Sequence, residues 1–362
     1  MRILMVSEFY PPHVGGVETF VQNLAENLVE HGHECTVLCT SDVEGDETIN
    51  GVRVMRLPNS PLEFHGVNFF FKGTLKRIIG EFDIVHINSF YPFLSLEASR
   101  ECVRQGVPYV FSPHYHGKGH SHLGKLLFYL YKPMASPLFR DAAMVICCSD
   151  YEKGLVLESY PFCDRVTTIS HGVQKFDLDN RGRDGNILFI GRMERYKGPQ
   201  HVVGIVKRLH EKGKEVKAVM VGDGPMKESI EKEIELSSLS GFVKIIPHVE
   251  RKQLDDLIKR SSLLVLLSEA EAYGLVVAEA LSQGTPCLVS DRMALREFEG
   301  EQGCIVYKGK DYDYDELAEI VWEVLSDPPA VGPLTDKIPS IKRMTGMYIS
   351  VYEKVLEGNR SQ

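Results

Sequence analysis

A pair of adjacent glycines stands where the chain is expected to turn from a strand into a helix. The turn Pro11–Glu18 follows an apolar run and contains Gly15 and Gly16. Glycine lets a backbone approach a ligand closely, and the first N–H groups of a helix, at its positive dipole end, suit a phosphate. The alternative is a turn between two elements that binds nothing.

Two basic residues occupy a second turn, within the segment 191–200. Arg192 and Lys197 follow the apolar run NILFI, and Pro199 suits the first position of the next helix. Open α/β sheets bind ligands at the carboxyl ends of their strands, where two cations would neutralise a diphosphate. A solvated charged loop is the alternative.

The segment 268–280 pairs two glutamates across seven intervening residues. Glu271 falls in a loop after the apolar run SLLVLL, and a helix is expected to begin near Gly274. Glu279 then lies about one turn inside the helix, with its side chain leaning back toward the helix start. Both carboxylates could accept hydrogen bonds from the vicinal hydroxyls of a ribose or hexose beside a phosphate. An exposed helix residue is the alternative for Glu279.

Short apolar runs alternate with helical patterns along nearly the whole chain. The expected strands are RILMVS, ECTVLCT, VRVMRL, DIVHINS, PYVFSP and MVICCS in the first part, and NILFIGR, KAVMVGDG, FVKIIPH, SLLVLLS and TPCLVSD in the second. Residues 17–31 read as a helix with Phe20, Val21, Leu24 and Leu28 on one face. Such alternation predicts an α/β protein with parallel sheets covered on both faces.

The pattern of elements is interrupted once and then restarts. The polar stretch 174–186 is interpreted as a hinge between an N-terminal Rossmann-like acceptor domain, 1–173, and a C-terminal Rossmann-like donor domain, 187–340. A length of 362 residues also favours two domains. The final helical segment, 341–362, has no strand after it, and we expect it to pack back on the first domain.

The three clusters together resemble glycosyltransferase family 4 of the GT-B fold. The resemblance rests on the Gly-Gly turn, the GRxxxxKG loop and the E-x7-E spacing from Glu271 to Glu279. Weaker landmarks occur in the same order: DIVHINS, the SPHYHG turn with His114, GDGP at 222–225, and VSD at 289–291 followed by Glu297. The resemblance covers nearly the whole chain. It implies two Rossmann-like domains whose parallel sheets face each other across a cleft.

The resemblance also implies a chemistry and a set of site residues. It implies a retaining transferase that takes a nucleotide-diphosphate sugar and needs no metal or other cofactor. Glu279 would hold the ribose hydroxyls of the donor, Glu271 the ring hydroxyls of the donor sugar, and Arg192 with Lys197 the diphosphate. The remaining donor-binding residues would be Gly15, Gly16, Tyr273, Gly274, Leu275 and Val276.

A histidine completes the implied catalytic set of His114, Glu271, Arg192 and Lys197. His114 would lie near the C6 side of the sugar and the reacting centre. His116 is the other candidate for that position. For both residues, the alternative is a histidine of the core or of the surface without a catalytic role.

Three departures from the family pattern stand out. After VSD the chain reads RMALRE where the family has a glycine-rich stretch, and His171 stands where an asparagine is usual. Asp177-Leu178-Asp179 has the spacing of a metal-binding DxD motif, but the rest of that pattern is missing. We therefore expect no metal site there.

Two segments of the first half combine basic and aromatic residues. The segment 114–140 contains no Asp or Glu and mixes three lysines with aromatic and leucine residues, and the segment 64–77 is similarly basic and aromatic. In a chain of net charge -9, such segments favour contact with an anionic membrane surface. A buried helix with solvated lysines is the alternative.

The composition limits the remaining classes of function. The net charge of -9 argues against general nucleic-acid binding, and none of the eight cysteines forms a CxxC pair, so we expect buried reduced thiols. No apolar run reaches the roughly 18 residues that span a bilayer. The N-terminus lacks the zones of a signal peptide. These features favour a cytoplasmic protein, or one peripheral to the inner face of the membrane.

The expected function is transfer of a hexose or N-acetylhexosamine from a UDP- or GDP-linked donor to an acceptor hydroxyl. A lipid-linked or membrane-surface acceptor is one candidate. The alternatives are a nucleotide-sugar-binding protein without catalysis, a GT-B-fold epimerase and a glycogen-type phosphorylase. A dinucleotide oxidoreductase is disfavoured, because VGDGPM at 221–226 lacks the third glycine of the GxGxxG fingerprint.

Overall fold

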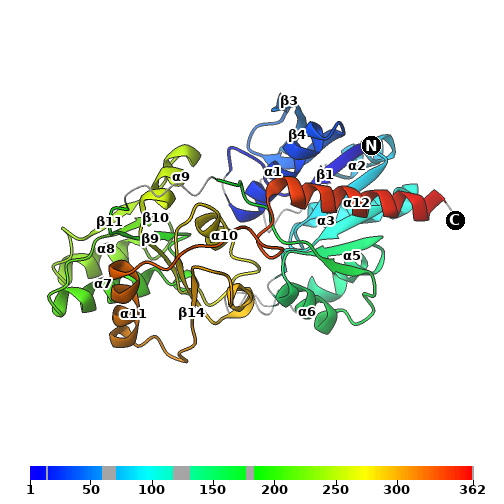
Figure 1. Cartoon of the computed structure of the whole chain (residues 1–362). Helices are drawn as coiled ribbons and strands as arrows, with labels where there is room; N and C mark the ends of the chain where they lie inside the picture. Colours follow the sequence, from blue (N-terminus) through cyan, green and yellow to red (C-terminus); the bar gives the residue numbers. More distant parts are fainter. Residues whose placement is uncertain (14, 59–70, 116, 118–130, 177–182, 361–362) are drawn as a thin grey trace. The chain divides into compact units, whose positions relative to one another are not determined.

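The computed structural model describes the chain except for residues 14, 59–70, 116, 118–130, 177–182 and 361–362 (Figure 1). The chain divides into two compact units. The first unit contains Met1–Gly172 and Pro339–Gln362, and the second contains Val173–Ile338. Each unit is built on one largely parallel sheet with helices between its strands, which confirms the predicted α/β class.

The first sheet has the strand order β3-β4-β2-β1-β5-β6-β7-β8. Its strands are β1 (Arg2–Val6), β2 (Glu34–Ser41), β3 (Gly45–Ile49), β4 (Val52–Pro58), β5 (Ile84–Asn88), β6 (Tyr109–Ser112), β7 (Met144–Cys147) and β8 (Val166–Thr168). Every neighbouring pair is parallel except β3 and β4, which form a hairpin. The edge strand β3 is not among the predicted strands, because its side chains are nearly all exposed and show no apolar alternation.

Helices follow most strands of the first unit. They are α1 (Gly16–Glu30), α2 (Phe71–Ile78), α3 (Phe93–Gln105), α5 (Ser136–Arg140), α6 (Asp150–Ser159) and α12 (Ile341–Arg360), with the 3-10 helix η1 (Ile79–Glu81). The face of α1 that helical spacing predicts is buried, and it consists of Phe20, Val21, Leu24 and Leu28.

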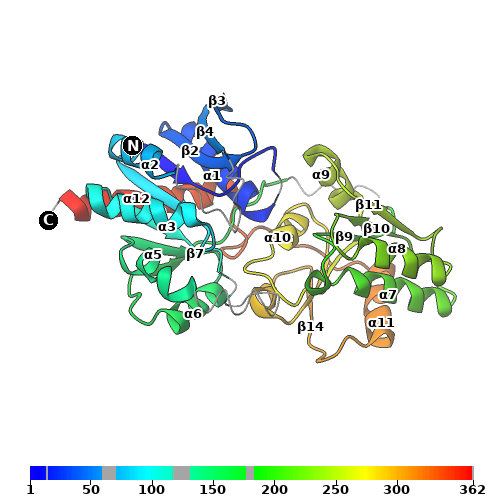
Figure 2. The ribbon, with the colours of Figure 1, turned by 180° about the vertical axis from the view of Figure 1, so that it is seen from behind.

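The C-terminal helix α12 lies beside α1, as Figures 1 and 2 show from opposite sides. Its residues Met344, Tyr348 and Tyr352 are buried in the same core as Phe20. The hydroxyl of Tyr352 lies 2.8 Å from Nδ1 of the buried His86. The helix therefore forms part of the core of the first unit, although it is separated from that unit in sequence.

The second sheet has the strand order β11-β10-β9-β12-β13-β14 and is entirely parallel. Its strands are β9 (Ile187–Ile190), β10 (Ala218–Val221), β11 (Val243–Ile246), β12 (Leu263–Leu266), β13 (Cys287–Ser290) and β14 (Cys304–Tyr307). The helices are α7 (Pro199–Glu211), α8 (Lys227–Leu236), α9 (Arg251–Arg260), α10 (Leu275–Ser282) and α11 (Tyr314–Ser326), with the 3-10 helices η2 (Arg195–Lys197) and η3 (Met293–Phe298).

Part of the predicted hinge, 174–186, is integrated into the second unit. The N–H of Asp184 donates to the carbonyl of Arg260 at 2.8 Å, and the N–H of Gly185 donates to the hydroxyl of Ser262 at 3.0 Å. The second unit thus runs from Val173 to Ile338, whereas the sequence places its domain at 187–340. The polar composition of these residues gives no sign of the hydrogen bonds that attach them to the end of α9 and to the residue before β12. Asp177-Leu178-Asp179 lies outside the described residues.

Candidate functional site

The order in which strands are added to the second sheet reverses at β9. From β9 the sheet extends through β10 and β11 on one side and through β12, β13 and β14 on the other. Ligands of open parallel sheets bind beyond the carboxyl ends of the strands at such a switch point. The loops after β9 and β12 leave this point, and they carry Arg192, Lys197 and Glu271.

Lys197 and Glu271 form an ion pair between these two loops. Nζ of Lys197 lies 2.7 Å from Oε1 of Glu271, and their side chains are only 20% and 12% exposed. The sequence predicts separate contacts for these residues, with a diphosphate and a sugar, and does not predict that they bind each other. A half-buried cation beside a carboxylate can bind a ligand that carries both phosphates and hydroxyls, because the cation pairs with phosphate and the carboxylate accepts from hydroxyls.

The loop of Lys197 is fixed against the loop of Glu271 by its backbone. The carbonyl of Tyr196 accepts from the N–H of Glu269 at 2.7 Å and from the hydroxyl of Ser268 at 3.0 Å. Gly198 has a left-handed φ of 79°, and a Cβ at this position would lie 2.5 Å from the carbonyl oxygen of Leu267. The final glycine of the GRxxxxKG pattern is thus required for the two loops to pack together.

Arg192 differs from Lys197 in its surroundings. Its side chain is 71% exposed, and its guanidinium forms an ion pair with Glu194. Arg192 follows β9 by two positions, so it lies at the same edge of the sheet as Lys197. An exposed guanidinium at this edge is accessible to a phosphate from solvent.

Helix α10 begins at Leu275 with Gly274 as its N-cap residue, and the sequence predicts a helix start near Gly274. Gly274 has a φ of 106°, and a Cβ there would lie 2.7 Å from Cδ2 of Leu295, so only glycine fits. The carbonyl of Gly274 accepts from the N–H of Val277 at 2.9 Å, which closes the first turn. The N–H groups of Leu275 and Val276 precede the helical hydrogen-bond ladder, and groups in this position can bind an anion.

The residue before this glycine serves as an anchor. Tyr273 is buried, and its hydroxyl donates to the carbonyl of Lys337 at 2.7 Å. Its ring also contacts Phe298, with 5.6 Å between ring centroids. The aromatic side chain of Tyr273 therefore fixes the start of α10, which leaves its backbone as the part that can face a ligand.

Glu279 is buried inside α10, where an exposed helix residue was the alternative. It is 8% exposed, and its Oε1 forms an ion pair with the guanidinium of Arg251 on α9. The same guanidinium lies 2.9 Å from Oδ1 of Asp255. Burial raises the pKa of the Glu279 carboxyl, and the charge of Arg251 opposes this rise.

Arg251 is a partner of the predicted site residue Glu279, and the sequence does not reveal this contact. Its i,i+4 relation to Asp255 can be read from the sequence. Its contact with Glu279, in contrast, joins α9, which precedes β12 in the sequence, to α10, which follows it. Nothing local in the segment RKQLDDLIKR indicates that contact.

The segment RMALRE, which departs from the family pattern, packs onto the same loops. It forms most of η3, and its Ala294 and Leu295 are buried. The N–H of Ala294 donates to the carbonyl of Glu271 at 3.4 Å. Leu295 fills the space beside Gly274. The departure thus supplies apolar packing beneath the loop of Glu271.

The glycine pair belongs to the first unit, at the start of α1. Gly15 is the N-cap residue with an extended φ of -174°, and no atom lies within 4 Å of a Cβ built on Gly16. The backbone conformation does not require glycine at Gly15, and at Gly16 the absent side chain leaves open space. Val14, between these glycines and His13, lies outside the described residues.

His114 also belongs to the first unit, just after β6. It is buried, it has a φ of 47°, and its ring lies edge-on to Phe20 at 5.4 Å between centroids. Its ring lies equally close, at 5.4 Å, to that of His171, the residue found in place of an asparagine. Burial lowers the pKa of His171 to about 3, so this imidazole is neutral at physiological pH. His116 lies outside the described residues.

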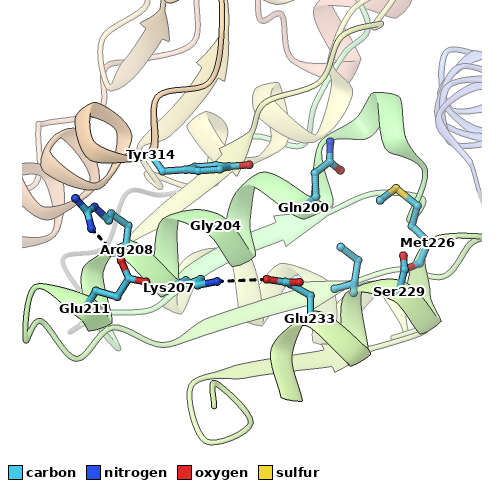
Figure 3. Close-up of a pocket in the computed structure, with 10 residues that line it drawn as sticks. Gln200, Gly204, Lys207, Arg208, Glu211, Met226, Ser229, Glu233 and Tyr314 are labelled. Carbon is cyan, nitrogen blue, oxygen red and sulfur yellow. Dashed lines mark hydrogen bonds and ion pairs between the residues drawn. The ribbon is translucent and has the colours of Figure 1, made fainter. Parts of the chain in front are cut away.

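The second unit also carries a surface groove. Its volume is about 500 Å³, and it is lined by side chains of α7 and α8 together with Tyr314 (Figure 3). The lining includes an ion pair of 3.6 Å between Lys207 and Glu233. None of the predicted donor-binding residues lines it.

The basic-aromatic segments are described only in part, since 59–70, 116 and 118–130 lie outside the described residues. Within α2, Lys76 and Arg77 are exposed, and Lys72 lies 3.5 Å from Glu97. Among the described residues, no helix is both long enough and apolar enough to cross a membrane. All eight cysteines are free, and every one except the half-buried Cys304 is buried, as predicted.

Two family models together match most of the chain. The model described as Glycosyltransferase Family 4 matches residues 14–175, and the model described as Glycosyl transferases group 1 matches residues 172–338. The chain belongs to the family 4 type of glycosyltransferases. It is therefore a transferase enzyme, and the second model covers all the predicted residues from Arg192 to Glu279.

Curated relatives and a solved structure agree with this family. Glycogen synthase of Mycobacterium tuberculosis is 28% identical over 370 residues, which cover 91% of this chain and 87% of that protein. The phosphatidylinositol N-acetylglucosaminyltransferase gpi3 subunit of Schizosaccharomyces pombe is 26% identical and covers 77% of this chain and 64% of its own length. The Anabaena protein HepE, solved in complex with UDP and glucose, superposes with a TM-score of 0.73 over 100% of both chains at 16% identity. This glycosyltransferase therefore has the GT-B fold.

Proposed function

We propose that this glycosyltransferase moves a hexose or N-acetylhexosamine from a UDP- or GDP-sugar to an acceptor hydroxyl, with retention at the anomeric carbon. The proposal rests on three features of the second unit: the Lys197–Glu271 ion pair, the N-terminus of α10, which has no side-chain cap, and the buried Glu279. Cation, helix amides and carboxylates are the groups that a diphosphate joined to two sugars requires.

Each part of this group has a proposed role. Glu279 accepts hydrogen bonds from the ribose hydroxyls, and Glu271 accepts them from the hydroxyls of the donor sugar. Lys197, with Arg192 and the N–H groups of Leu275 and Val276, binds the diphosphate. In the first unit, Gly15 and Gly16 complete the phosphate cradle by their backbone, and His114 lies near the sugar.

The main chemical demand is to stabilise the diphosphate as it departs. Lys197 is held in place by Glu271, so little reorganisation is needed as negative charge develops on the leaving phosphate. We propose same-face attack, in which the leaving phosphate accepts the proton of the acceptor hydroxyl. Fixed cations and amides then take the role that a metal ion has in other transferases, and no cofactor is proposed.

UDP is the first nucleotide to test. HepE, which shares the fold, was solved with UDP and glucose. A thermal-shift panel of UDP, GDP, ADP and their common sugar conjugates would compare the nucleotides directly. A nucleotide at about 100 times its dissociation constant should stabilise the folded protein by about 2.7 kcal/mol. Stabilisation by none of these nucleotides would contradict the proposed donor site.

Lys197→Ala tests the diphosphate contact. We expect turnover, measured as nucleotide release in the presence of acceptor, to fall about 100-fold or more, because a fixed charge at the leaving group is lost. Lys207→Ala is the matched control, since Lys207 pairs with Glu233 in the surface groove. Near-normal turnover in Lys197→Ala would refute the assignment. Nucleotide binding without turnover in the wild type would favour a binding protein.

We propose that the acceptor is lipid-linked. The enzyme would then be cytoplasmic and would work at the inner face of the membrane. Support comes from the basic-aromatic segments 64–77 and 114–140 and from the name of the phosphatidylinositol N-acetylglucosaminyltransferase relative. Cosedimentation with vesicles that contain anionic phospholipid, at low salt, tests this proposal. Lys76→Glu combined with Arg77→Glu should lower the bound fraction, whereas Lys252→Glu in the second unit should not. Wild-type protein that stays in the supernatant would contradict it.

A further inference from the structure

Three neighbouring strands of the first sheet bring metal-ligating side chains together. His114 follows β6, Cys148 follows β7 and His171 follows β8. These strands are adjacent and parallel, so their carboxyl ends meet at one edge of the sheet. One ligand atom from each residue lies within 4.8 Å of the other two, and all three side chains are buried.

The chemistry of this cluster suits zinc. Two imidazoles and one thiolate are ligands that Zn²⁺ accepts in a tetrahedral site, with bonds of about 2.0–2.3 Å. Such bonds place the ligand atoms roughly 3.3–3.6 Å apart. Ligand atoms that lie up to 4.8 Å apart in this structure would therefore move closer by at most about 1.5 Å on binding. Three protein ligands leave a fourth position for water or for a substrate.

A buried carboxylate fixes the backbone beside His114 and at Cys148. Glu152, on α6, is fully buried, and its Oε1 accepts from the N–H of Tyr115, the residue after His114, at 2.5 Å. Its Oε2 accepts from the N–H of Cys148 at 2.6 Å. These two hydrogen bonds hold the backbone of the segments that carry His114 and Cys148. The negative charges of Glu152 and of a Cys148 thiolate would together balance Zn²⁺ in a buried place.

Aromatic packing restrains the two imidazoles. The ring of His171 stacks on Phe20 at 4.6 Å between centroids, and the ring of His114 lies edge-on to the same phenyl group. Since Phe20 lies on α1, this helix holds both rings from one side. Less reordering is then needed when the two nitrogens and the sulfur converge on an ion.

We propose that His114, Cys148 and His171 form a zinc-binding site in the first unit. On binding, the Cys148 thiol loses its proton to solvent, and the thiolate and two imidazole nitrogens coordinate the ion. Because the bound zinc coordinates the imidazole of His114, this side chain is no longer available to the donor sugar, and sugar transfer is inhibited. This inhibitory consequence rests on the proposed role of His114 near the donor sugar, whereas the binding itself does not.

Binding is tested on the full chain after treatment with a chelator. Zinc chloride is titrated calorimetrically, and Co²⁺ serves as a spectroscopic probe, because a cobalt–thiolate bond gives a charge-transfer band in the near ultraviolet. We expect one equivalent of zinc and a cobalt–thiolate band in the wild type. Cys148→Ser and His171→Asn should each weaken zinc binding by about 100-fold, and Cys148→Ser should lose the band. Cys163→Ser, a buried thiol of the same unit outside the cluster, should behave as wild type.

The outcomes separate the zinc site from the proposed function. No zinc uptake by the wild type, or unchanged uptake in both Cys148→Ser and His171→Asn, would overturn the site. Unfolding curves in zinc-free buffer show whether these two variants are folded. The ratio of turnover with zinc to turnover without it should fall in the wild type and stay near unity in Cys148→Ser. A zinc-free wild type without transferase activity would contradict the proposed function instead, since uptake is measured independently.

Discussion

At the scale of single residues, burial and charge act against each other at Glu279. Burial raises the pKa of this carboxyl, while the adjacent Arg251 favours the ionised form that can accept two hydroxyl hydrogen bonds. Asp255, which shares the guanidinium, acts in the opposite direction to Arg251. Arg251 therefore has a proposed role beyond structure: it keeps Glu279 ionised for the donor nucleotide.

Arg251→Gln tests this role through the pH dependence of nucleotide binding. Protonation of Glu279 removes an acceptor, so affinity should fall as the pH drops through its raised pKa. Without Arg251 the pKa rises further, and the fall should begin at a higher pH. At pH 7 we expect affinity about tenfold weaker than in the wild type. Dissociation constants measured across pH check this expectation.

Lys252→Gln is the matched control, because Lys252 is an exposed neighbour on α9. Its pH profile should overlay that of the wild type. If Arg251→Gln instead bound nucleotide more tightly at every pH, Arg251 would compete with the ribose for Glu279, and the proposed role would be wrong.

At the scale of elements, the site depends on where one helix begins. The start of α10 is set by Gly274, whose positive φ and close neighbour Leu295 exclude any side chain. The loops after β9 and β12 then meet through the backbone of Tyr196 and Gly198. The elements of the second unit thus position Lys197, Glu271 and Glu279 through glycines that admit close packing.

Gly274→Ala should destabilise the protein by about 1–3 kcal/mol, because alanine is strained at this φ and its Cβ meets Leu295. It should also weaken nucleotide binding, since the N–H groups of Leu275 and Val276 would shift. Chemical denaturation and nucleotide titration measure the two effects. Gly300→Ala is the control: Gly300 has a φ of 88° but no atom within 4 Å of an added Cβ. Equal effects of both substitutions on nucleotide binding would contradict a special role for Gly274.

At the scale of the whole molecule, the chain leaves the first unit at Gly172 and returns to it at Pro339. Gly172 packs against the start of α12, just after the point of return. A Cβ added at Gly172 would lie 2.6 Å from Cα of Ile341, and the N–H of Gly172 lies 2.9 Å from Sδ of Met344. The docking of α12 on the first unit thus begins at the position where the chain passes to the second.

Gly172→Ala should destabilise the docking of α12 by about 1–3 kcal/mol, because backbone atoms of Ile341 cannot move aside cheaply. Denaturant unfolding, with hydrogen exchange of α12 as a local probe, measures this effect. Gly346→Ala, on α12 itself, has no atom within 4 Å of the added Cβ and should stabilise the helix by roughly 0.5–1 kcal/mol. Unchanged exchange of α12 in Gly172→Ala would contradict the importance of this contact.

The sequence by itself determined the features that depend on neighbours along the chain. The buried face of α1, the start of α10 at Gly274 and the free buried cysteines follow from spacing, glycine chemistry and composition. The resemblance carried by the three clusters reached the family and the two-domain α/β class, because motif order survives where overall identity is low. The exposed strand β3 was missed, since strand prediction relies on apolar alternation that an edge strand does not need.

Only the tertiary structure decided which functional groups meet. Lys197 and Glu271 pair across 74 positions of sequence, and Arg251 reaches Glu279 across 28. His114, Cys148 and His171 come together because β6, β7 and β8 are neighbours in the sheet. Periodicity is a local property, whereas strand order follows from how apolar faces are buried together over the whole unit. The residues that could carry chemistry are therefore visible in the sequence, and the contacts that tune them are not.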